Sequence, residues 1–391
     1  MQRRVNDVVS DLREELRALT LAIHRNPELG LSEYKACALQ TELLTKYGFE
    51  IENPYCGMET AYKASYKSGK AGPKIAMLAE YDALPGLGHG CGHNLIAMIS
   101  VGAGIAMREF ADEYGGEIYV FGTPAEESAG GKVIMADAGA FDDMDVAMMS
   151  HPSNMDAESM NTLAINSYKV SFYGKTAHAA AAPQEGINAL DAAINFFNMV
   201  NALRQQTQDD ARIHGIITKG GEAPNIIPDH TEVVMEARAA KIDYLETLCE
   251  KVLLCAEAAA KGTGCRVEIG PGGGNFLDTN SNLALSALNA RQMEKLGIKL
   301  VPPAPAPLPA SSDLGDVSYR CPAIQNCFAI TEDAACGPHT VEFEKAAASD
   351  AAIERGMEFI QGFVLTAIEL MTSPKALAEV QAEFDKISRR P

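Results

Sequence analysis

The chain has 391 residues, of which 47% are hydrophobic, and a formal net charge of −19. A single hydrophobic core stops growing at about 250–300 residues, so two domains are expected. The excess of negative charge repels phosphate backbones and anionic lipid headgroups, which argues against nucleic-acid and membrane partners. The nine cysteines are an odd number and form no CxxC pair, so we expect reduced thiols and a cytoplasmic protein.

Two segments could be mistaken for membrane-directed elements. Residues 1–30 begin with basic residues, but acidic side chains interrupt the apolar positions, which predicts an amphipathic helix and not a signal peptide. The apolar segment 351–371 contains charged residues on one side and apolar residues at helical spacing, which predicts a packed helix and not a membrane span.

The first 150 residues alternate short apolar strands with helices. Strands are expected at 74–78, 117–122 and 145–149. Helices are expected at 33–48 with Ser32 as the N-cap, from about 93 to 110, and briefly from 131. Short buried strands separated by helices indicate an α/β domain of three layers, in which helices cover both faces of a sheet.

Near residue 166 the pattern changes to that of a smaller domain. The expected elements follow the order βαββαβ, which is typical of a two-layer, ferredoxin-like fold: strand 168–174, helix 187–204, strands 212–219 and 231–239, helix 243–261 and strand 265–269. A glycine-rich linker follows at 270–275, and a helix is expected from 282 to 296. The predicted organisation is a first catalytic part over 1–166, an inserted domain over 167–278 and a second catalytic part over 279–391.

Polar residues stand directly after the three expected strands of the first domain, in "AEYDALP", "TPAEE" and "SHP". In open α/β sheets, ligands bind at the carboxyl ends of the strands. These three segments are therefore the first candidates for a functional site.

The stretch "GLGHGCGHNLI" (86–96) contains Cys91 and His93 among glycines. A thiolate and an imidazole two residues apart in an extended segment could both bind one borderline metal such as Zn²⁺. The alternative is a buried free cysteine beside a histidine that caps the next helix. A redox role is not favoured, because no second cysteine lies nearby in the sequence.

The adjacent Glu126 and Glu127 follow an apolar strand and precede glycines. One carboxylate could bind a metal while the other takes a proton from the attacking water, although two neighbouring glutamates are more often a solvated loop. His151 and His339 would each be structural or solvated if they stood alone. Together, these groups at strand ends and loop tips favour a metal site.

Seven segments, in this order along the chain, resemble the dinuclear metal amidohydrolases that include aminoacylases, hippurate hydrolases, indoleacetyl-amino-acid hydrolases and carboxypeptidase G. The segments are "RNPELGLSEY", "YDALPGLGHGCGHN", "GTPAEESAGGK", "GKTAHAAAAPQEGINALDA", "GGEAPNIIPDHTEV", "SSDLGDVS" and "GPHTVEF". Asn94 makes the second segment similar to the branch that holds aminobenzoyl-glutamate hydrolase subunits and β-alanyl-lysine-type dipeptidases.

The resemblance implies two divalent metal ions per subunit, Zn²⁺ or Mn²⁺, and a general base that is Glu126. The metal ligands that it implies are Cys91, His93, Glu127, His151 and His339. Glu80 and Asp82 are expected to flank the site, either as carboxylates that orient a ligand or as caps of the following turn.

The same resemblance makes the inserted domain a lid that also forms a homodimer. His178 would then stabilise the oxyanion of the reaction, and Asn225 and Arg238 would bind substrate. Without the resemblance, His178 would be a turn histidine and Arg238 a member of a surface ion pair. His230 and the segment "GGGNF" depart from the pattern of the relatives, so the substrate preference could differ.

These observations predict a metal-dependent amidohydrolase that cleaves the amide bond of N-acyl or N-aminoacyl amino acids, which are small molecules with a free carboxylate. Acidic Asp313 and Asp316 in "SSDLGDVS" could favour a basic residue on the amine side, or could form a capped turn. One alternative function is a dipeptidase for β-alanyl or similar dipeptides. Another, from a different class, is a non-catalytic binding protein on the same fold.

Overall fold

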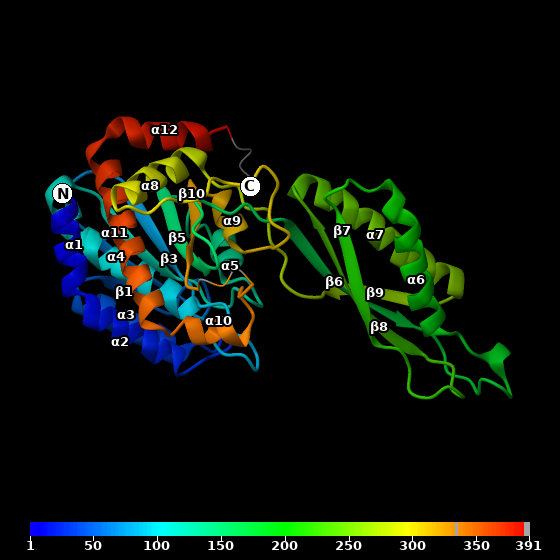
Figure 1. Cartoon of the computed structure of the whole chain (residues 1–391). Coiled ribbons are helices and arrows are strands. Elements are labelled where there is room, and N and C mark those ends of the chain that lie inside the picture. The colour runs from blue at the N-terminus through cyan, green and yellow to red at the C-terminus, as the bar shows by residue number, and fades with distance from the viewer. Residues whose placement is uncertain (332, 334, 387–391) are drawn as a thin grey trace. The chain divides into compact units, whose positions relative to one another are not determined.

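Figure 1 shows a computed structural model of the chain, which describes residues 1–331, 333 and 335–386. The chain forms two compact units. Unit 1 comprises Met1–Asn161, Thr279–Leu308 and Ser312–Pro391, and unit 2 comprises Thr162–Asp278 with Pro309–Ser311. The boundary expected after residue 166 therefore falls inside a strand, because β6 (Ala164–Tyr173) already belongs to unit 2.

Unit 1 contains a six-stranded mixed sheet with the order β1-β2-β4-β3-β5-β10. Its strands are β1 (Glu50–Glu52), β2 (Tyr62–Lys67), β3 (Lys74–Ala79), β4 (Glu117–Gly122), β5 (Val146–Ser153) and β10 (Ala323–Ala329). The last four run parallel to one another, whereas β1 and β2 pair antiparallel at one edge. The three strands expected from the sequence are confirmed, and the other three were not expected.

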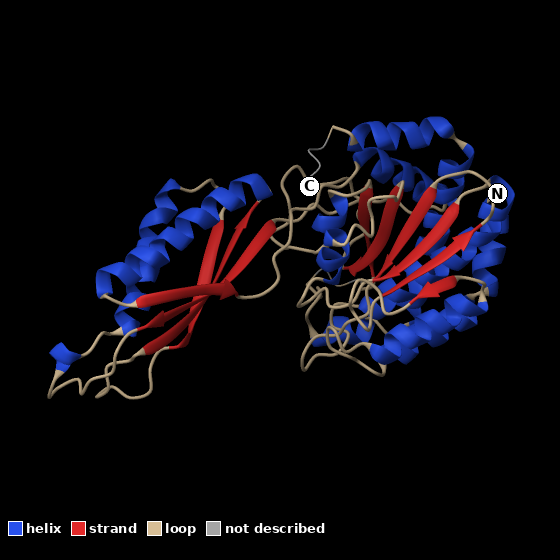
Figure 2. Ribbon diagram, turned by 180° about the vertical axis from the view of Figure 1, so that it is seen from behind, coloured by secondary structure: helices blue, strands red, loops and turns tan. Residues whose placement is uncertain are grey.

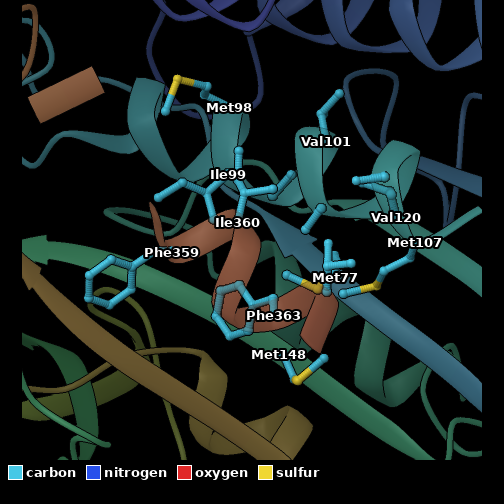
Figure 3. Packing of buried hydrophobic residues seen from close by; sticks show 14 of the residues in the cluster. Met77, Met98, Ile99, Val101, Met107, Val120, Met148, Phe359, Ile360 and Phe363 are labelled. Carbon is cyan, nitrogen blue, oxygen red and sulfur yellow. The ribbon is translucent and has the colours of Figure 1, made fainter. Parts of the chain in front are cut away.

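Both faces of this sheet are covered by helices, as Figure 2 shows. Along β3, Ile75 and Met77 join the core under α4, while Ala76 and Leu78 join the core on the opposite face. In Figure 3, Met77 of β3 and Met148 of β5 lie against Phe363 of α11. Because alternate side chains of a strand point to opposite faces, an uninterrupted apolar run is what a sheet covered on both sides requires.

The helices on one face of the sheet are α1 (Gln2–Asp11), α2 (Arg13–His24), α3 (Tyr34–Lys46), α4 (His93–Tyr114), α8 (Leu283–Lys295), α11 (Asp350–Thr372) and α12 (Pro374–Phe384). The other face carries α5 (Gly131–Asp137) and α9 (Leu314–Ser318), and α10 (Val341–Ala346) follows β10. The N-terminal segment forms two helices instead of the one expected, because Leu12 N bonds Val9 O in a tighter turn. Helix α4 is long and apolar enough to span a membrane by composition, but 89% of that window is buried in the protein.

Unit 2 has the βαββαβ order that the sequence predicts. Its strands are β6, β7 (Arg212–Lys219), β8 (His230–Ala239) and β9 (Arg266–Pro271), and its helices are α6 (Ala189–Leu203) and α7 (Ile242–Thr263) with the short turns η1 (Pro183–Glu185) and η2 (Arg204–Gln206). All strand pairs are antiparallel in the order β7-β8-β6-β9, and both long helices pack on one face of the sheet (Figure 2). The two-layer fold is confirmed.

Candidate active site

The carboxyl ends of the four parallel strands in unit 1 carry the candidate residues. The residues that follow or end these strands are Glu80 and Asp82 after β3, Glu126 and Glu127 after β4, His151 within β5 and His339 after β10. Parallel strands end at the same edge of a sheet, so segments that are far apart in sequence meet there.

The loop between β3 and α4 presents Cys91 and His93. His93 is the first residue of α4, and Gly92 before it has a φ of 77°. A Cβ atom on Gly92 would lie 2.6 Å from Pro152 Cγ. Glycine is therefore needed both for the left-handed turn and for the close approach of β5.

The buried imidazole of His93 is held by a carboxylate. Its Nδ1 lies 2.9 Å from Asp82 Oδ1, and because a carboxylate only accepts hydrogen bonds, Nδ1 carries the proton. The Nε2 atom is buried and has no hydrogen-bond partner within the described residues. Asp82 Oδ2 also accepts a hydrogen bond from Glu127 N at 3.0 Å, so this one carboxylate positions His93 and the segment of Glu127.

His151 and His339 are oriented in a similar way. The Nδ1 atom of His151 donates to the carbonyl oxygen of Pro152 at 2.7 Å, which leaves Nε2 as the free ring nitrogen, 3.5 Å from Cys91 Sγ. His339 Nε2 lies 3.1 Å from Glu127 Oε1. The backbone N–H of His339 donates to Gly90 O at 2.8 Å, which ties this loop to the loop of Cys91.

Metal-ligand atoms gather here in four groups whose members lie within 4.8 Å of one another. The groups are Cys91, His93 and His151; Cys91, Glu127 and His339; His93, Glu126 and Glu127; and Glu80, Glu126 and Asp313. Two ligands of one tetrahedral Zn²⁺, with Zn–N of about 2.1 Å and Zn–S of about 2.3 Å, are about 3.4–3.6 Å apart. The Cys91–His151 separation of 3.5 Å and the unpartnered His93 Nε2 both fit a divalent metal.

Glu126 lies among other acidic groups. Desolvation of its partly exposed side chain, together with the negative charges of Glu80 and Asp313, raises the pKa of Glu126 well above its ordinary value. Lys132 is fully buried and contacts Glu80 Oε1 at 2.5 Å and Asp313 Oδ1 at 2.6 Å. Burial opposes the charge of Lys132, but these carboxylates outweigh burial and raise its pKa.

Comparison with known proteins supports one family. The peptidase dimerisation domain matches residues 164–263. The Xaa-Arg dipeptidase of Mus musculus is 37% identical over 98% of this chain and 92% of its own length, and a p-aminobenzoyl-glutamate hydrolase chain of Escherichia coli is 33% identical over 68% of this chain and 59% of its own. The chain belongs to the M20 peptidase family.

Solved structures of M20 proteins share the fold. An aminobenzoyl-glutamate utilization protein from Klebsiella pneumoniae superposes with a TM-score of 0.75 at 18% identity, over 92% of this chain and 98% of that one. A dinuclear metal-binding M20 peptidase from Bacillus subtilis has a TM-score of 0.67 at 19% identity, over 93% and 99% of the two chains. The relatives named above are a dipeptidase and a hydrolase, so the enzyme interpretation is confirmed and the non-catalytic alternative is not supported.

The structure brings six predicted residues of this M20 protein together in unit 1. They are Cys91, His93, Glu126, Glu127, His151 and His339. Asp82 contacts His93 directly, so of the two roles left open for it the structure favours orienting this histidine. Asn94 is instead buried in α4, where it donates to Thr20 Oγ1 and Ala347 O, so its role is in packing.

His178 and Asn225 lie on neighbouring loops of unit 2. Ala179 N donates to Asn225 O at 3.0 Å, and His178 pairs with Ile226 in an isolated β-bridge. The backbone N–H groups of Ala180 and Ala181 both lie 3.2 Å from His178 Nδ1. Since Nδ1 accepts, the exposed ring presents Nε2–H as a donor.

Arg238 lies on β8 and is held within unit 2. Its Nη1 donates to Ser311 Oγ at 3.2 Å, and its Nη2 lies 3.3 Å from Glu236 Oε2. The Nε atom is buried without a partner in the described part of the chain. The ion pair expected in the absence of the family resemblance is thus present, and one donor of the guanidinium group remains available.

The structure bears on one alternative left open by the sequence and corrects one expectation. Asp313 does not offer its charge to a substrate, because both of its oxygens bind Lys132, one at Nζ and one at the backbone N. Ser32 does not cap α3; Glu33 occupies the N-cap position without a side-chain cap hydrogen bond. The role of Lys132 was not predicted from the sequence, because nothing in the segment "AGGK" indicates that this lysine is buried.

Glu33 was also missed, and it contacts the loop that carries Glu126. Its buried carboxylate accepts hydrogen bonds from Ala125 N at 2.8 Å and from Thr60 Oγ1 at 2.9 Å. Ala125 precedes Glu126 and has a positive φ of 60°, a conformation that non-glycine residues seldom adopt. The contact from Glu33 therefore holds a strained backbone next to Glu126.

We expect the stabilising effect of Glu33→Gln to grow with pH. Burial raises the pKa of Glu33 to about 7, so the folded chain keeps this proton up to about pH 7 while the unfolded chain loses it from about pH 4.5. Stability of the wild type is thus lost as the pH rises between these values. The free energy of unfolding of the variant, relative to wild type, should rise by about 2–3 kcal/mol between pH 5 and pH 8. Urea unfolding of chelator-treated protein measures it, and a difference that does not change with pH would contradict the buried-acid account.

Replacing Asp82 with asparagine is expected to weaken metal binding while the fold is kept. Loss of the carboxylate that fixes a ligand histidine costs about 10–100-fold in metal affinity. Competition with a chromophoric chelator measures the affinity, and Asp143→Asn, at an exposed position, is the matched control. Equal affinities in the two variants would show that Asp82 does not position His93 for a metal.

Proposed function

We propose that this protein hydrolyses the amide bond of N-acyl or N-aminoacyl amino acids that carry a free carboxylate. The proposed metal ligands are Cys91, His93, Glu127, His151 and His339, with Glu126 as the general base. The observation that supports this most strongly is the meeting of five donor side chains from four strand ends beside a carboxylate of raised pKa.

Two divalent ions, Zn²⁺ or Mn²⁺, are proposed for this donor set. Imidazole and thiolate favour Zn²⁺, whereas the carboxylates also suit Mn²⁺. Bound there, the ions would polarise the scissile carbonyl and lower the pKa of the attacking water. The ring nitrogens are already oriented for them, because Asp82 and the carbonyl of Pro152 hold the protonated Nδ1 atoms of His93 and His151.

Glu126 is proposed to accept the proton of the water and to return it to the leaving amine. A general base works best when its pKa lies near the operating pH, and desolvation with two nearby carboxylates raises the pKa of Glu126 in that direction. Lys132 holds those carboxylates, Glu80 and Asp313, in place. Glu33 fixes the backbone of Ala125 next to the base.

The residues of unit 2 are proposed to complete the reaction. The Nε2–H donor of His178 would stabilise the oxyanion, and the guanidinium group of Arg238 with the amide of Asn225 would bind the substrate carboxylate and backbone. The support is the orientation of the His178 ring by two backbone N–H groups and the unpartnered Nε of Arg238.

We expect His178→Ala to lower kcat by about 10²–10³-fold, the cost of removing one oxyanion donor. Metal content and unfolding should stay as in the wild type, because among the described residues the exposed ring accepts hydrogen bonds only from its own turn. Steady-state kinetics measures the effect, with Lys261→Ala, at an exposed position of α7 in the same unit, as the control. A kcat within a few-fold of wild type would return His178 to the role of a turn residue.

The relatives suggest two substrate groups within the proposed class. One relative is named for Xaa-Arg dipeptides and another for p-aminobenzoyl-glutamate. The test is hydrolysis of a panel of Xaa-Arg and β-alanyl dipeptides, aminobenzoyl-glutamate, and N-acetyl and N-benzoyl amino acids by metal-loaded protein, with Glu126→Gln as the blank. A dipeptide-only profile would favour the dipeptidase alternative, and no turnover of any member would overturn the proposed substrate class.

A homodimer through unit 2 is part of the proposal. The peptidase dimerisation domain matches this unit, and β7 is an edge strand of its sheet with Ile216 64% exposed. An exposed apolar edge strand is a ready site for pairing with another chain. Light scattering should give twice the mass of the chain. We also propose a reducing, cytoplasmic location, in keeping with the nine free cysteines, all of which lie in the described residues.

A further inference from the structure

Glu80 carries a buried oxygen that the fold leaves without a partner. The residue is 1% exposed, and its Oε2 atom makes no hydrogen bond within the described part of the chain. Leaving a carboxylate oxygen buried and unpaired costs free energy, so such an atom needs a ligand to compensate it. Glu80 is not among the five ligands assigned above.

The other oxygen of Glu80 is firmly held. Oε1 contacts Lys132 Nζ at 2.5 Å, and Lys132 is anchored in turn by Asp313 at both Nζ and the backbone N. A carboxylate with one oxygen fixed in this way has its second oxygen fixed in direction too. Carboxylates that bind a metal are themselves hydrogen-bonded by neighbouring groups, which fix their orientation. Lys132 would orient Glu80 in this way.

The free oxygen of Glu80, Oε2, points toward His93. Glu80 Oε2 lies 3.4 Å from His93 Nε2, and both atoms are buried and without a hydrogen bond in the part of the chain that the structure describes. Two ligands of one tetrahedral ion, each with a bond of about 2.1 Å, are about 3.4 Å apart. The proton on His93 resides on Nδ1 against Asp82, so Nε2 offers a lone pair to an ion and not a proton to Glu80.

From this geometry we propose that Glu80 is a further metal ligand, which binds through Oε2 the same ion as His93. The proposal rests on the proposed function, since it requires that His93 binds an ion. The two carboxylates that contact Lys132 then have different roles. Glu80 binds the ion through its free oxygen, whereas Asp313, with both oxygens bound to Lys132, only anchors the lysine.

The test compares Glu80→Gln with Asp313→Asn, which removes the other charge next to Lys132. Both variants and the wild type are loaded with Co²⁺, and the bound ions are counted while the visible absorption spectrum is recorded. We expect Glu80→Gln to lower the affinity of one ion at least about tenfold, since even outer partners cost about 10–100-fold, and to change the Co²⁺ spectrum. Asp313→Asn should keep the spectrum of the wild type.

Two controls keep the outcomes distinct. If Glu80→Gln does not fold, Glu80→Asp retains the charge beside Lys132 but withdraws the oxygen, and should show the same loss of affinity and altered spectrum. Unchanged affinity and spectrum in the folded Glu80 variant would overturn the assignment of Glu80. If the wild type itself binds no Co²⁺, the proposed function fails, and not the role of Glu80 alone.

Discussion

Glu126→Gln is expected to abolish hydrolysis while the metal content of the protein stays unchanged. Glutamine keeps the size of the side chain but cannot take a proton from the attacking water, and general acid–base catalysis contributes about 10²–10⁴-fold in rate. The amide is neutral, so the variant lacks the electrostatic repulsion between Glu126 and the carboxylates of Glu80 and Asp313. We therefore expect the variant to be at least as stable as the wild type. Turnover and elemental metal analysis of one preparation measure both effects.

The control for this variant is Glu113→Gln, at a position on the surface of α4 where the side chain pairs with Arg4, outside the site. It should leave turnover unchanged. If Glu126→Gln retained near-normal turnover, the base would have to be another group. If it lost metal as well as activity, Glu126 would be a ligand.

His93→Ala is expected to lose metal and activity together. His93 belongs to two of the four groups of ligand atoms, so its removal disrupts more than one part of the cluster. It also leaves the buried carboxylate of Asp82 without the N–H donor of His93, which adds a stability cost of about 1–3 kcal/mol or more to the loss of metal-linked stabilisation. Metal analysis and thermal unfolding with and without added Zn²⁺ measure these effects.

Exposed His214→Ala serves as the control for loss of a histidine. Zn²⁺ should raise the unfolding temperature of the wild type and of this control, but not that of His93→Ala. An equal rise in His93→Ala would show that the ions bind elsewhere.

The strands and the ligand-bearing segments could be predicted from the sequence because they obey local rules. The run of apolar residues in β3 and the glycines around Cys91 each determine their own backbone. The missed β10 is different: its segment "AIQNCFA" carries polar Gln325 and Asn326, and Asn326 is buried against Asn289, a partner distant in sequence. No local sequence pattern indicates that such a distant partner exists.

The roles of charged residues were the least predictable part of the site. Asp82 and Glu80 stand two residues apart after one strand, yet one holds a histidine and the other a lysine. The pairing of Lys132 with Asp313 joins positions 181 residues apart, so only the fold reveals that Asp313 is neutralised. The acidic groups could be located from the sequence, but tertiary structure determines what each one does.

If side chains at four strand ends form a two-metal hydrolytic site, the metal content of protein purified without chelator should show it. We expect two divalent ions per chain, with hydrolysis lost on chelation and restored by Zn²⁺, Mn²⁺ or Co²⁺. Less than one ion per chain, with no gain in bound metal or hydrolysis when these ions are added, would rule out a two-metal site.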